Sequence, residues 1–383
     1  MKRFILDKIA TDLSRKMVFL TGPRQSGKST LAQALASNSD RYPVAQVLNW
    51  DVADDRHVML ERRWRPDAQL IVLDELHKMN DWRAWLKGTY DGRQPGQTFL
   101  VTGSARLDAF SRSGESLAGR YFSWRLHPVT VAEYVRMAGV SSEDALDRLL
   151  ERGGFPEPLL GDSAVDADRW RRLYIDGVVR DDILEFSRLR EVQAMRLFID
   201  MIRSRVGSPL SLASLARDLQ VSPTTLAGYL GILEALHIVF VVRPFHRNIS
   251  RAILKEPKVY FFDTGLVDAR LSEGGARFEN ACAAMLLRHV HFLQDAEGRE
   301  VTLRYVRDKE GREVDFVVCE GDEPLLFAES KLTDAQVPNL LKSLAERFPQ
   351  ARATLVVRHL RQPQQQGRVS VERASAWLAS LSA

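Results

Sequence analysis

The sequence predicts a protein of the mixed α/β class with several domains, and four stretches carry that prediction. Residues 17–30 read as a buried strand, a glycine-containing loop and the start of a helix. Residues 70–73 and 99–101 are two further apolar runs, and each ends in polar residues, as strands of an open α/β sheet do beside a ligand. Residues 276–358 alternate between helix-like and strand-like patterns. We therefore expect an N-terminal domain built on an open sheet and a separate C-terminal α/β domain.

Composition sets limits on the class of protein. The 383 residues are enough for two to four domains, each with its own core. A net charge of +4 and a pI of about 9.0 allow nucleic acid as a partner without requiring it. The cysteines are Cys282 and Cys319 alone, which excludes a disulfide framework and a cysteine zinc site. The apolar run before Asp7 is too short for a signal peptide, and no stretch approaches the roughly 18 apolar residues of a membrane span, so we expect a cytoplasmic protein.

The strongest signal is the stretch GPRQSGKST, which matches the phosphate-binding pattern G-x-x-x-x-G-K-S between a strand and a helix. The glycines let backbone N–H groups turn inward around phosphates, and the helix N-terminus adds partial positive charge. Lys28 then reaches the β- and γ-phosphates, and the Ser29 hydroxyl ligates Mg²⁺. The residues that we expect to bind the nucleotide are Gly22, Pro23, Arg24, Gln25, Ser26, Gly27, Lys28, Ser29 and Thr30.

Two acids follow the second apolar run and complete the expected nucleotide site. Asp74 ends the strand, where it would hold Mg²⁺, and Glu75 comes next, where it could orient and deprotonate the attacking water. A strand that simply ends at the surface would look the same. The phosphate-binding loop upstream favours the catalytic interpretation.

Two further residues have alternatives that the sequence leaves open. Ser104 follows the third apolar run, where its hydroxyl could contact the γ-phosphate or merely form a turn. Arg120 lies just before an alternating strand within the stretch SLAGRYFSWRL (116–126). It is a candidate arginine finger, and a salt bridge is the alternative.

Four stretches together resemble a widespread prokaryotic family of AAA-type ATPases, whose members join an N-terminal ATPase domain to a C-terminal domain of unknown function: TGPRQSGKST, IVLDELHKMNDWRAWLKGTYD, FLVTGSAR and SLAGRYFSWRLHPVTVAEY. The stretches RGGFPEPLL (152–160) and KVYFFDTGLVDA (258–269) are similar to later landmarks of that family, so the resemblance runs to about residue 358. The resemblance implies ATP and Mg²⁺ as ligands, with Lys28, Ser29, Asp74 and Glu75 at the nucleotide site. An assembly of like subunits through the ATPase domain is a further expectation.

The middle of the chain reads as a helical lid or connector at 131–195, followed by a winged helix-turn-helix at 196–260. One helix ends near Leu219, Ser222 caps the next, and a strand at 237–243 would form the wing. The window 196–260 holds nine Lys and Arg against four Asp and Glu, which favours DNA binding. The positions that we expect to be exposed on the second helix are Thr224, Thr225, Gly228 and Tyr229, and none of them is basic. A winged helix used for domain packing is therefore the alternative.

The C-terminal region predicts an αβββαβ order, which resembles the core of restriction-endonuclease-like folds. The expected elements are a helix at 276–293, strands at 301–307, 313–319 and 325–331, a helix at 335–347 and a strand at 353–358. The site of such folds is an Asp followed by Glu-x-Lys. Asp315, Glu329 and Lys331 fit that pattern, and side chains two apart on a strand share a face.

If the strands align, Asp315 and Glu329 can ligate one Mg²⁺, Lys331 can activate or orient water, and Glu279 is a possible fourth group. A nuclease-like domain that only docks on DNA or a partner is the alternative. The full expectation is an ATPase core at 1–130, the connector, the winged helix, and the nuclease-like domain at 261–383. We expect a Mg-ATP hydrolysing AAA-type ATPase that acts on DNA. The alternative function is a nucleotide-controlled switch with a non-catalytic docking module.

Overall fold

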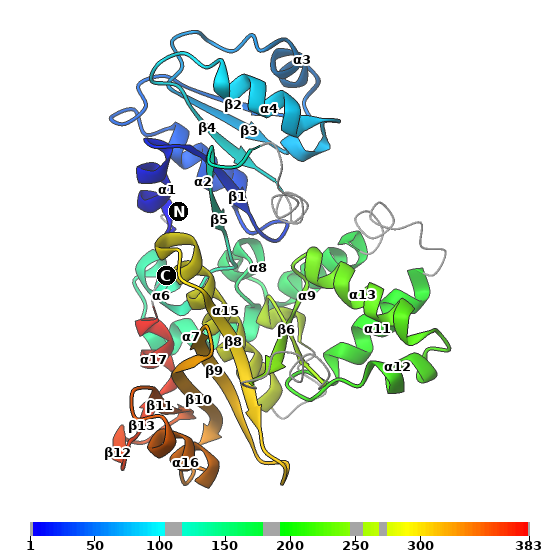
Figure 1. Cartoon of the computed structure of the whole chain (residues 1–383), viewed down its shortest axis with the longest axis vertical. Coiled ribbons are helices and arrows are strands. Elements are labelled where there is room, and N and C mark those ends of the chain that lie inside the picture. The colour runs from blue at the N-terminus through cyan, green and yellow to red at the C-terminus, as the bar shows by residue number, and fades with distance from the viewer. Residues whose placement is uncertain (1–2, 104–116, 179–191, 246–255, 268–273, 382–383) are drawn as a thin grey trace. The chain divides into compact units, whose positions relative to one another are not determined.

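The structure is a computed structural model, and the chain divides into two compact units, residues 1–127 and 128–383. Each unit has its own sheet (Figure 1). The residues described are 3–103, 117–178, 192–245, 256–267 and 274–381. Within these ranges no helix combines the length and the apolar character that crossing a bilayer requires.

The first unit is a five-stranded sheet in which every pair of neighbours is parallel. The order is β2-β3-β4-β1-β5, and the strands are β1 (Met17–Thr21), β2 (Ala45–Asn49), β3 (Leu70–Asp74), β4 (Thr98–Thr102) and β5 (Tyr121–Arg125). The central strands are continuous apolar runs because both faces are covered. All strands point the same way, so the polar residues that end β1, β3 and β4 meet at one edge. The predicted open sheet is confirmed.

Helices cover both faces of this sheet: α1 (Leu6–Leu13), α2 (Lys28–Ala36), α3 (Ala53–Glu61), α4 (Trp82–Asp91), and a 3-10 turn at Leu76–Lys78. Trp82, Leu86 and Tyr90 are buried against the sheet, where Trp82 meets Phe19 edge to face at 6.0 Å. This packing fixes the helix that follows the acidic end of β3.

The second unit has a mixed eight-stranded sheet in the order β12-β13-β11-β10-β9-β8-β6-β7. Its strands are β6 (Val239–Pro244), β7 (Lys258–Phe261), β8 (Val301–Arg307), β9 (Glu313–Glu320), β10 (Glu323–Thr333), β11 (Arg352–His359), β12 (Gln364–Gln366) and β13 (Val369–Arg373). Its helices are α6 (Val131–Ala138), α7 (Ser142–Arg152), α8 (Pro156–Leu160), α9 (Ala164–Gly177), α11 (Val192–Arg203), α12 (Leu212–Asp218), α13 (Pro223–Ala235), a 3-10 turn at Thr264–Leu266, α15 (Gly275–Glu297), α16 (Asn339–Arg347) and α17 (Ala374–Ser380).

The order predicted for the C-terminal region is confirmed. The helix α15, the three antiparallel strands β8 to β10, the helix α16 and the strand β11 follow one another as expected, with β11 parallel to β10. The chain continues beyond this pattern into β12, β13 and α17, which sequence reasoning did not predict. These elements extend the sheet past β11.

The predicted helix pair of the middle region is present, and its cap is as expected, since the Ser222 hydroxyl accepts the N–H of Thr225 at 3.0 Å. One expectation about this helix was wrong. Tyr229 is buried, 2% exposed, and its ring faces that of Phe198, because α13 packs this side on α11. The predicted wing strand, β6, belongs to the large sheet through β7 and β8.

One apolar core runs through the second unit from Val129 to Leu378. It joins side chains of the connector helices, of α12 and α13, and of α15. The boundaries that we expected at 195 and 260 therefore do not separate independent cores, and 260 falls within β7.

The two later landmarks of the sequence meet inside this unit. The buried Asp263 carboxylate accepts N–H groups from Gly154, Phe155 and Gly265, with the last two at 3.1 and 2.7 Å. Gly153 has φ +84°, and a Cβ there would lie 2.2 Å from Asp263 Oδ1. The glycines thus allow the close approach that satisfies the carboxylate, so both landmarks have a structural explanation.

We predict that Asp263→Ala lowers the free energy of unfolding of the second unit by at least about 2 kcal/mol. The substitution leaves three buried N–H groups unsatisfied, each at a cost of about 1–3 kcal/mol. Urea unfolding followed by circular dichroism would measure the loss. The exposed Asp162→Ala in the loop after α8 is the control, and equal unfolding midpoints for the two variants would contradict the role of Asp263.

Candidate functional site

The phosphate-binding loop joins β1 to α2, and its backbone requires glycine where β1 ends. Gly22 has φ +138°, and a Cβ there would lie 2.3 Å from the carbonyl oxygen of Leu126, which follows β5. Gln25 and Gly27 adopt left-handed conformations with φ of +60° and +95°. A loop that alternates in this way turns its N–H groups toward its concave side, which suits an anion.

The side chains of the loop agree with that use. Lys28 is buried, and its ammonium donates to the carbonyl oxygens of Gly22 at 3.1 Å and Pro23 at 2.7 Å. The Ser26 hydroxyl is buried and has no hydrogen-bond partner among the described residues. An orphaned polar atom in a buried loop is costly unless a ligand completes it. Of the other predicted residues, Pro23 is buried, Arg24 is half-buried, and Gln25 and Thr30 are exposed.

The Asp74 carboxylate accepts three hydrogen bonds at the edge where the carboxyl ends of the strands meet. Its Oδ2 accepts from the Ser29 hydroxyl at 2.8 Å and from Asn49 Nδ2 at 3.4 Å, and its Oδ1 accepts from the Thr102 hydroxyl. The parallel register explains this, because Asn49 and Thr102 flank Asp74 on β2 and β4. Ser29 and Asp74 were predicted. The hydrogen bonds from Asn49 and Thr102 to Asp74 were not predicted. Both residues end strands that neighbour β3, and this position could have indicated the contacts.

Glu75 follows Asp74 in a left-handed conformation with φ +58°. Its N–H donates to the carbonyl oxygen of Thr102 at 3.0 Å, which holds the residue at the same edge. Its carboxylate lies 3.5 Å from Lys78 Nζ. Ser104, the remaining residue predicted for this site, lies outside the described residues.

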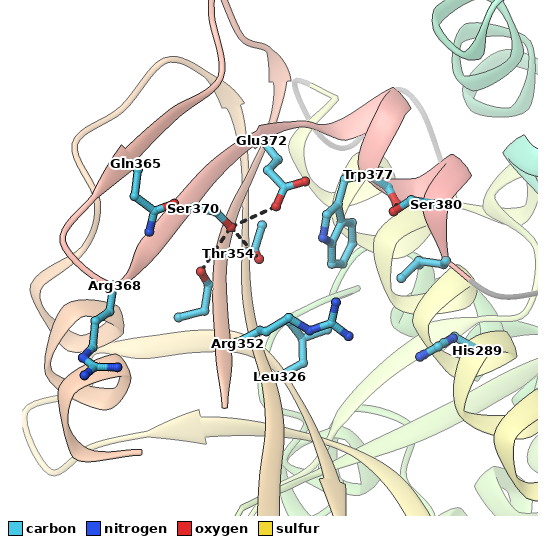
Figure 2. Close-up of a pocket in the computed structure, with 12 residues that line it drawn as sticks. His289, Leu326, Arg352, Thr354, Gln365, Arg368, Ser370, Glu372, Trp377 and Ser380 are labelled. Carbon is cyan, nitrogen blue, oxygen red and sulfur yellow. Dashed lines mark hydrogen bonds between the residues drawn. The ribbon is translucent and has the colours of Figure 1, made fainter. Parts of the chain in front are cut away.

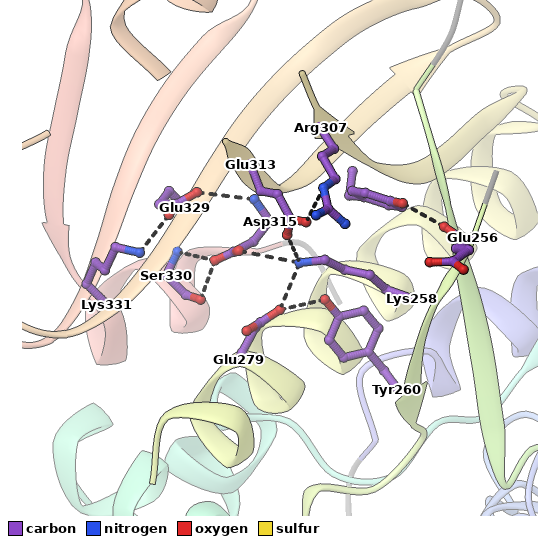
Figure 3. Close-up of polar contacts among 11 residues, drawn as sticks. Glu256, Lys258, Tyr260, Glu279, Arg307, Glu313, Asp315, Glu329, Ser330 and Lys331 are labelled. Atoms are coloured by element: carbon purple, nitrogen blue, oxygen red, sulfur yellow. Dashed lines mark hydrogen bonds and ion pairs between the residues drawn. The ribbon is translucent and has the colours of Figure 1, made fainter. Parts of the chain in front are cut away.

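A second group of ionisable side chains lies at one end of the large sheet (Figure 3). We name it the acid–lysine cluster, and it consists of Lys258, Glu279, Glu313, Asp315, Glu329 and Lys331. The members come from β7, α15, β9 and β10. The structure thus brings together the four residues predicted for the C-terminal site: Glu279, Asp315, Glu329 and Lys331.

Asp315, Glu329 and Lys331 contact one another as the strand alternation predicted. Glu329 Oε2 accepts the N–H of Asp315 at 3.2 Å, and Glu329 Oε1 accepts from Lys331 Nζ at 2.7 Å. Asp315 Oδ2 accepts the N–H and the hydroxyl of Ser330 at 2.9 and 2.7 Å. The two carboxylates therefore lie side by side on adjacent strands.

Lys258 was not predicted, and it lies at the centre of the acids. Its side chain is 2% exposed, and Nζ lies 2.9 Å from Glu313, 3.5 Å from Glu279 and 3.7 Å from Asp315. The Tyr260 hydroxyl donates to Glu279 at 2.7 Å. The sequence feature that could have indicated this role is a lysine at the start of the apolar run KVYFF (258–262). In the described part of the chain, no group of three or more His, Cys, Asp or Glu is arranged to hold a metal ion.

Comparison with known proteins shows which family models match the chain. Residues 14–135 match the family model of an AAA domain, and residues 143–276 and 274–376 match two domains of unknown function, DUF8612 and DUF4143. The first unit is an AAA-type P-loop domain.

The relatives cover most of the chain. An uncharacterized protein of Mycobacterium tuberculosis is 28% identical over 351 residues, which are 89% of this chain and 76% of the relative. An uncharacterized protein of Haemophilus influenzae is 23% identical over 80% of each chain. The RuvB Holliday junction branch migration motor of Thermotoga maritima is 19% identical over 62% of this chain and 88% of its own, with a TM-score of 0.32.

Arg120 of the AAA-type domain was predicted to be either an arginine finger or a salt-bridge partner, and in the structure it forms a salt bridge with Asp91. Its guanidinium makes two hydrogen bonds with Asp91, at 2.8 and 3.0 Å. Its carbonyl oxygen accepts the N–H of Met17, at the start of β1. The phosphate-binding loop follows the other end of β1, about 13 Å away at roughly 3.3 Å per residue. Arg120 therefore does not reach the nucleotide loop of its own chain.

Burial sets the protonation of the acids at both sites. In the AAA-type domain, burial raises the pKa of Glu75, and Lys78 opposes that shift. In the cluster, burial and then the neighbouring Asp315 raise the pKa of Glu279 and of Glu329 to about 7. Burial disfavours the charged form of Lys258, but Glu279 and Asp315 outweigh it and raise its pKa, so this ammonium stays charged.

A hollow of about 460 Å³ lies elsewhere in the second unit, between β11, β13 and α17 (Figure 2). Its walls carry two cations, Arg352 and Arg368, and one acid, Glu372. The Ser370 hydroxyl lies 2.9 Å from Glu372 and 3.0 Å from the Thr354 hydroxyl. The lining carries a net charge of +1 with histidine neutral, and it contains none of the predicted site residues.

We predict that the free energy of unfolding falls as the pH rises from about 4.5 to about 7, because Glu279 and Glu329 hold protons in the folded chain that the unfolded chain has released. Urea unfolding without divalent metal, at a series of pH values, would measure this slope. Glu329→Gln should flatten it, and Asp322→Asn in the exposed turn before β10 should not. Equal slopes for wild type and Glu329→Gln would contradict the prediction.

Proposed function

We propose that this protein binds and hydrolyses Mg-ATP in its AAA-type domain and that the nucleotide controls a second unit that acts on DNA. One observation carries the ATPase part. The Ser29 hydroxyl and the Asp74 carboxylate are hydrogen-bonded at 2.8 Å beside the phosphate-binding loop, at the edge where three parallel strands end.

The residues at this edge fit Mg-ATP by their chemistry. Mg²⁺ prefers oxygen ligands, which Ser29 and Asp74 supply, and when bound it would neutralise charge on the phosphate oxygens. Lys28 and the N–H groups of the loop hold the phosphates. Thr102 and Asn49 fix the orientation of Asp74, and Glu75 takes a proton from the attacking water. The raised pKa of Glu75 makes it a better base than an exposed glutamate.

Action on DNA is supported by the acid–lysine cluster. Asp315 and Glu329 lie side by side, and Lys331 contacts Glu329 at 2.7 Å. Four carboxylates face Lys258, Lys331 and Arg307, which lies 3.3 Å from Glu313, so one negative charge is left over when all groups are ionised. A divalent cation would be held by Asp315 and Glu329, with Glu279 nearby, and Lys331 would orient the water that attacks a phosphodiester.

The alternative is that the second unit docks on a partner without cutting it. Lys258 favours this function, because its ammonium already pairs with Glu279, Glu313 and Asp315. Because the Lys258 ammonium neutralises part of the buried negative charge, the fold does not need a metal ion for that purpose. In that case the chain is a nucleotide-controlled switch, and its assembly through the AAA-type domain is the property that ATP would change.

We predict that Lys28→Ala abolishes ATP binding, because the loop loses the cation that contacts the phosphates. Glu75→Gln should still bind ATP and should hydrolyse it about 10²–10⁴-fold more slowly, because only proton transfer from water is lost. Binding of a fluorescent ATP analogue and release of phosphate would be measured separately. Glu61→Gln on α3 is the control. Wild-type turnover in Glu75→Gln would rule out that residue as the base.

We predict that Asp315→Ala abolishes Mg²⁺- or Mn²⁺-dependent cleavage of DNA and leaves ATP hydrolysis unchanged. Linear, circular and single-stranded DNA would each be incubated with the full chain, ATP and metal. Asp322→Ala, in an exposed turn of the same hairpin, should cleave like wild type. No cleavage of any form by the wild type would favour the docking function, while cleavage that survives in Asp315→Ala would place the activity elsewhere.

A further inference from the structure

The AAA-type domain has a second concave surface, which we name the basic groove. It is lined by residues 13–16, 40–43 and 93–98, together with Gln69 and Tyr90, and has a volume of about 910 Å³. Lys16 immediately precedes β1 and Thr98 begins β4. The groove therefore lies at the N-terminal edge of the parallel sheet, whereas the phosphate-binding loop follows the opposite end of β1.

The charge of the groove is strongly one-sided. Its lining contains four cationic side chains and one acidic side chain, which gives +3 at neutral pH. The cations are Arg15, Lys16, Arg41 and Arg93, and the acid is Asp40. None of the four cations forms an ion pair with a described residue, whereas Arg120 in the same unit is paired with Asp91 and Arg65 with Asp67.

Uncharged groups hold these cations in place. The Arg93 guanidinium lies 3.8 Å from the centroid of the Tyr90 ring and donates to the Tyr90 carbonyl at 2.7 Å. Arg15 and Lys16 both lie over the ring of Phe122, at 5.2 and 4.9 Å. Aromatic rings and carbonyls orient a cation without cancelling its charge. The groove thus presents positioned positive charges that form no ion pair with a carboxylate of the described chain.

Stabilisation of helix ends is the competing explanation, since α1 and α4 both end at this edge. Arg41 donates to the carbonyl of Ala10 in α1, and Arg93 donates to that of Tyr90 in α4. Cations are favourable at helix C-termini. Each arginine, however, uses one of its five N–H donors in this way. The side chains of Arg15 and Lys16 donate to no carbonyl of the described residues, so helix ends do not account for them.

We infer that the basic groove binds the phosphodiester backbone of DNA, an inference that rests on the proposed action of this protein on DNA. Three separate segments supply the cations around an open hollow, which suits a chain of phosphates better than one compact anion. Lysine and arginine contacts to phosphates supply affinity that does not depend on sequence. Since the groove and the nucleotide loop lie at opposite ends of β1, DNA and ATP would bind without competing.

The test uses the full chain and a fluorescein-labelled DNA duplex of mixed sequence, with anisotropy measured over a series of salt concentrations. The double variant Arg15→Gln, Lys16→Gln should bind more weakly and lower the slope of log K against log salt by about 0.9 for each lost phosphate contact. For two contacts the ratio of wild-type to variant affinity then changes about tenfold over a fourfold range of salt. Lys8→Gln, an exposed lysine of α1 outside the groove, should match wild type.

The outcomes separate the groove from the proposed function. If the double variant keeps the wild-type affinity and salt slope, the inference that the groove binds DNA is wrong, while the proposed action of the protein on DNA is unaffected. The same result with a lower melting temperature would assign the cations to the helix ends. Polyglutamate competing better than DNA would also overturn the inference, in favour of an acidic protein. Absence of DNA binding by the wild type, with ATP turnover intact, would overturn action on DNA itself.

Discussion

Lys258 is a charged side chain buried in the second unit, and the arrangement of three elements around it depends on neutralising that charge. An isolated ammonium does not remain charged in an apolar interior unless carboxylates pair with it. The carboxylates come from α15 and from β9, while the lysine comes from β7. Removing one partner of a buried pair costs about 3–5 kcal/mol, far more than the roughly 0–1 kcal/mol of a surface salt bridge. The ammonium therefore fixes where the strand ends meet, and with them the positions of Asp315 and Glu329.

The AAA-type domain reaches a comparable result with hydrogen bonds instead of a buried cation. Its parallel register places Asn49, Asp74 and Thr102 in one row across β2, β3 and β4. The donors on either side orient the carboxylate of Asp74, and Ser29 reaches it from the start of α2. In both units a carboxylate at a strand end is held by groups from neighbouring elements, so the position of each candidate site follows from sheet register.

Local patterns predicted the parts of this protein that depend on neighbours in sequence. The phosphate-binding loop, the cap at Ser222 and the helix and strand order after residue 275 are of this kind, because glycine, capping and alternation signals act over a few residues. Tyr229 and Lys258 depend on distant neighbours. Tyr229 packs against Phe198 of α11, and Lys258 contacts acids that follow it by 21 to 57 residues. Such contacts depend on which elements pair or pack together, and the short-range periodicity of the sequence does not reveal that pairing.

The same contacts bear on whether a metal and Lys258 can share the cluster. Each oxygen of the Asp315 and Glu329 carboxylates already has a protein partner: Lys258, Ser330, Lys331 or the N–H of Asp315. The cluster is therefore satisfied as a purely protein network, as a docking module requires. A carboxylate oxygen carries two lone pairs, however, and Asp315 Oδ1 has only the Lys258 ion pair at 3.7 Å. The closest contact of Lys258 is with Glu313, at 2.9 Å. Under the proposed nuclease function, an ion that approached Asp315 Oδ1 would compete with the longest of the three ion pairs of Lys258 and would leave the shortest, to Glu313, intact.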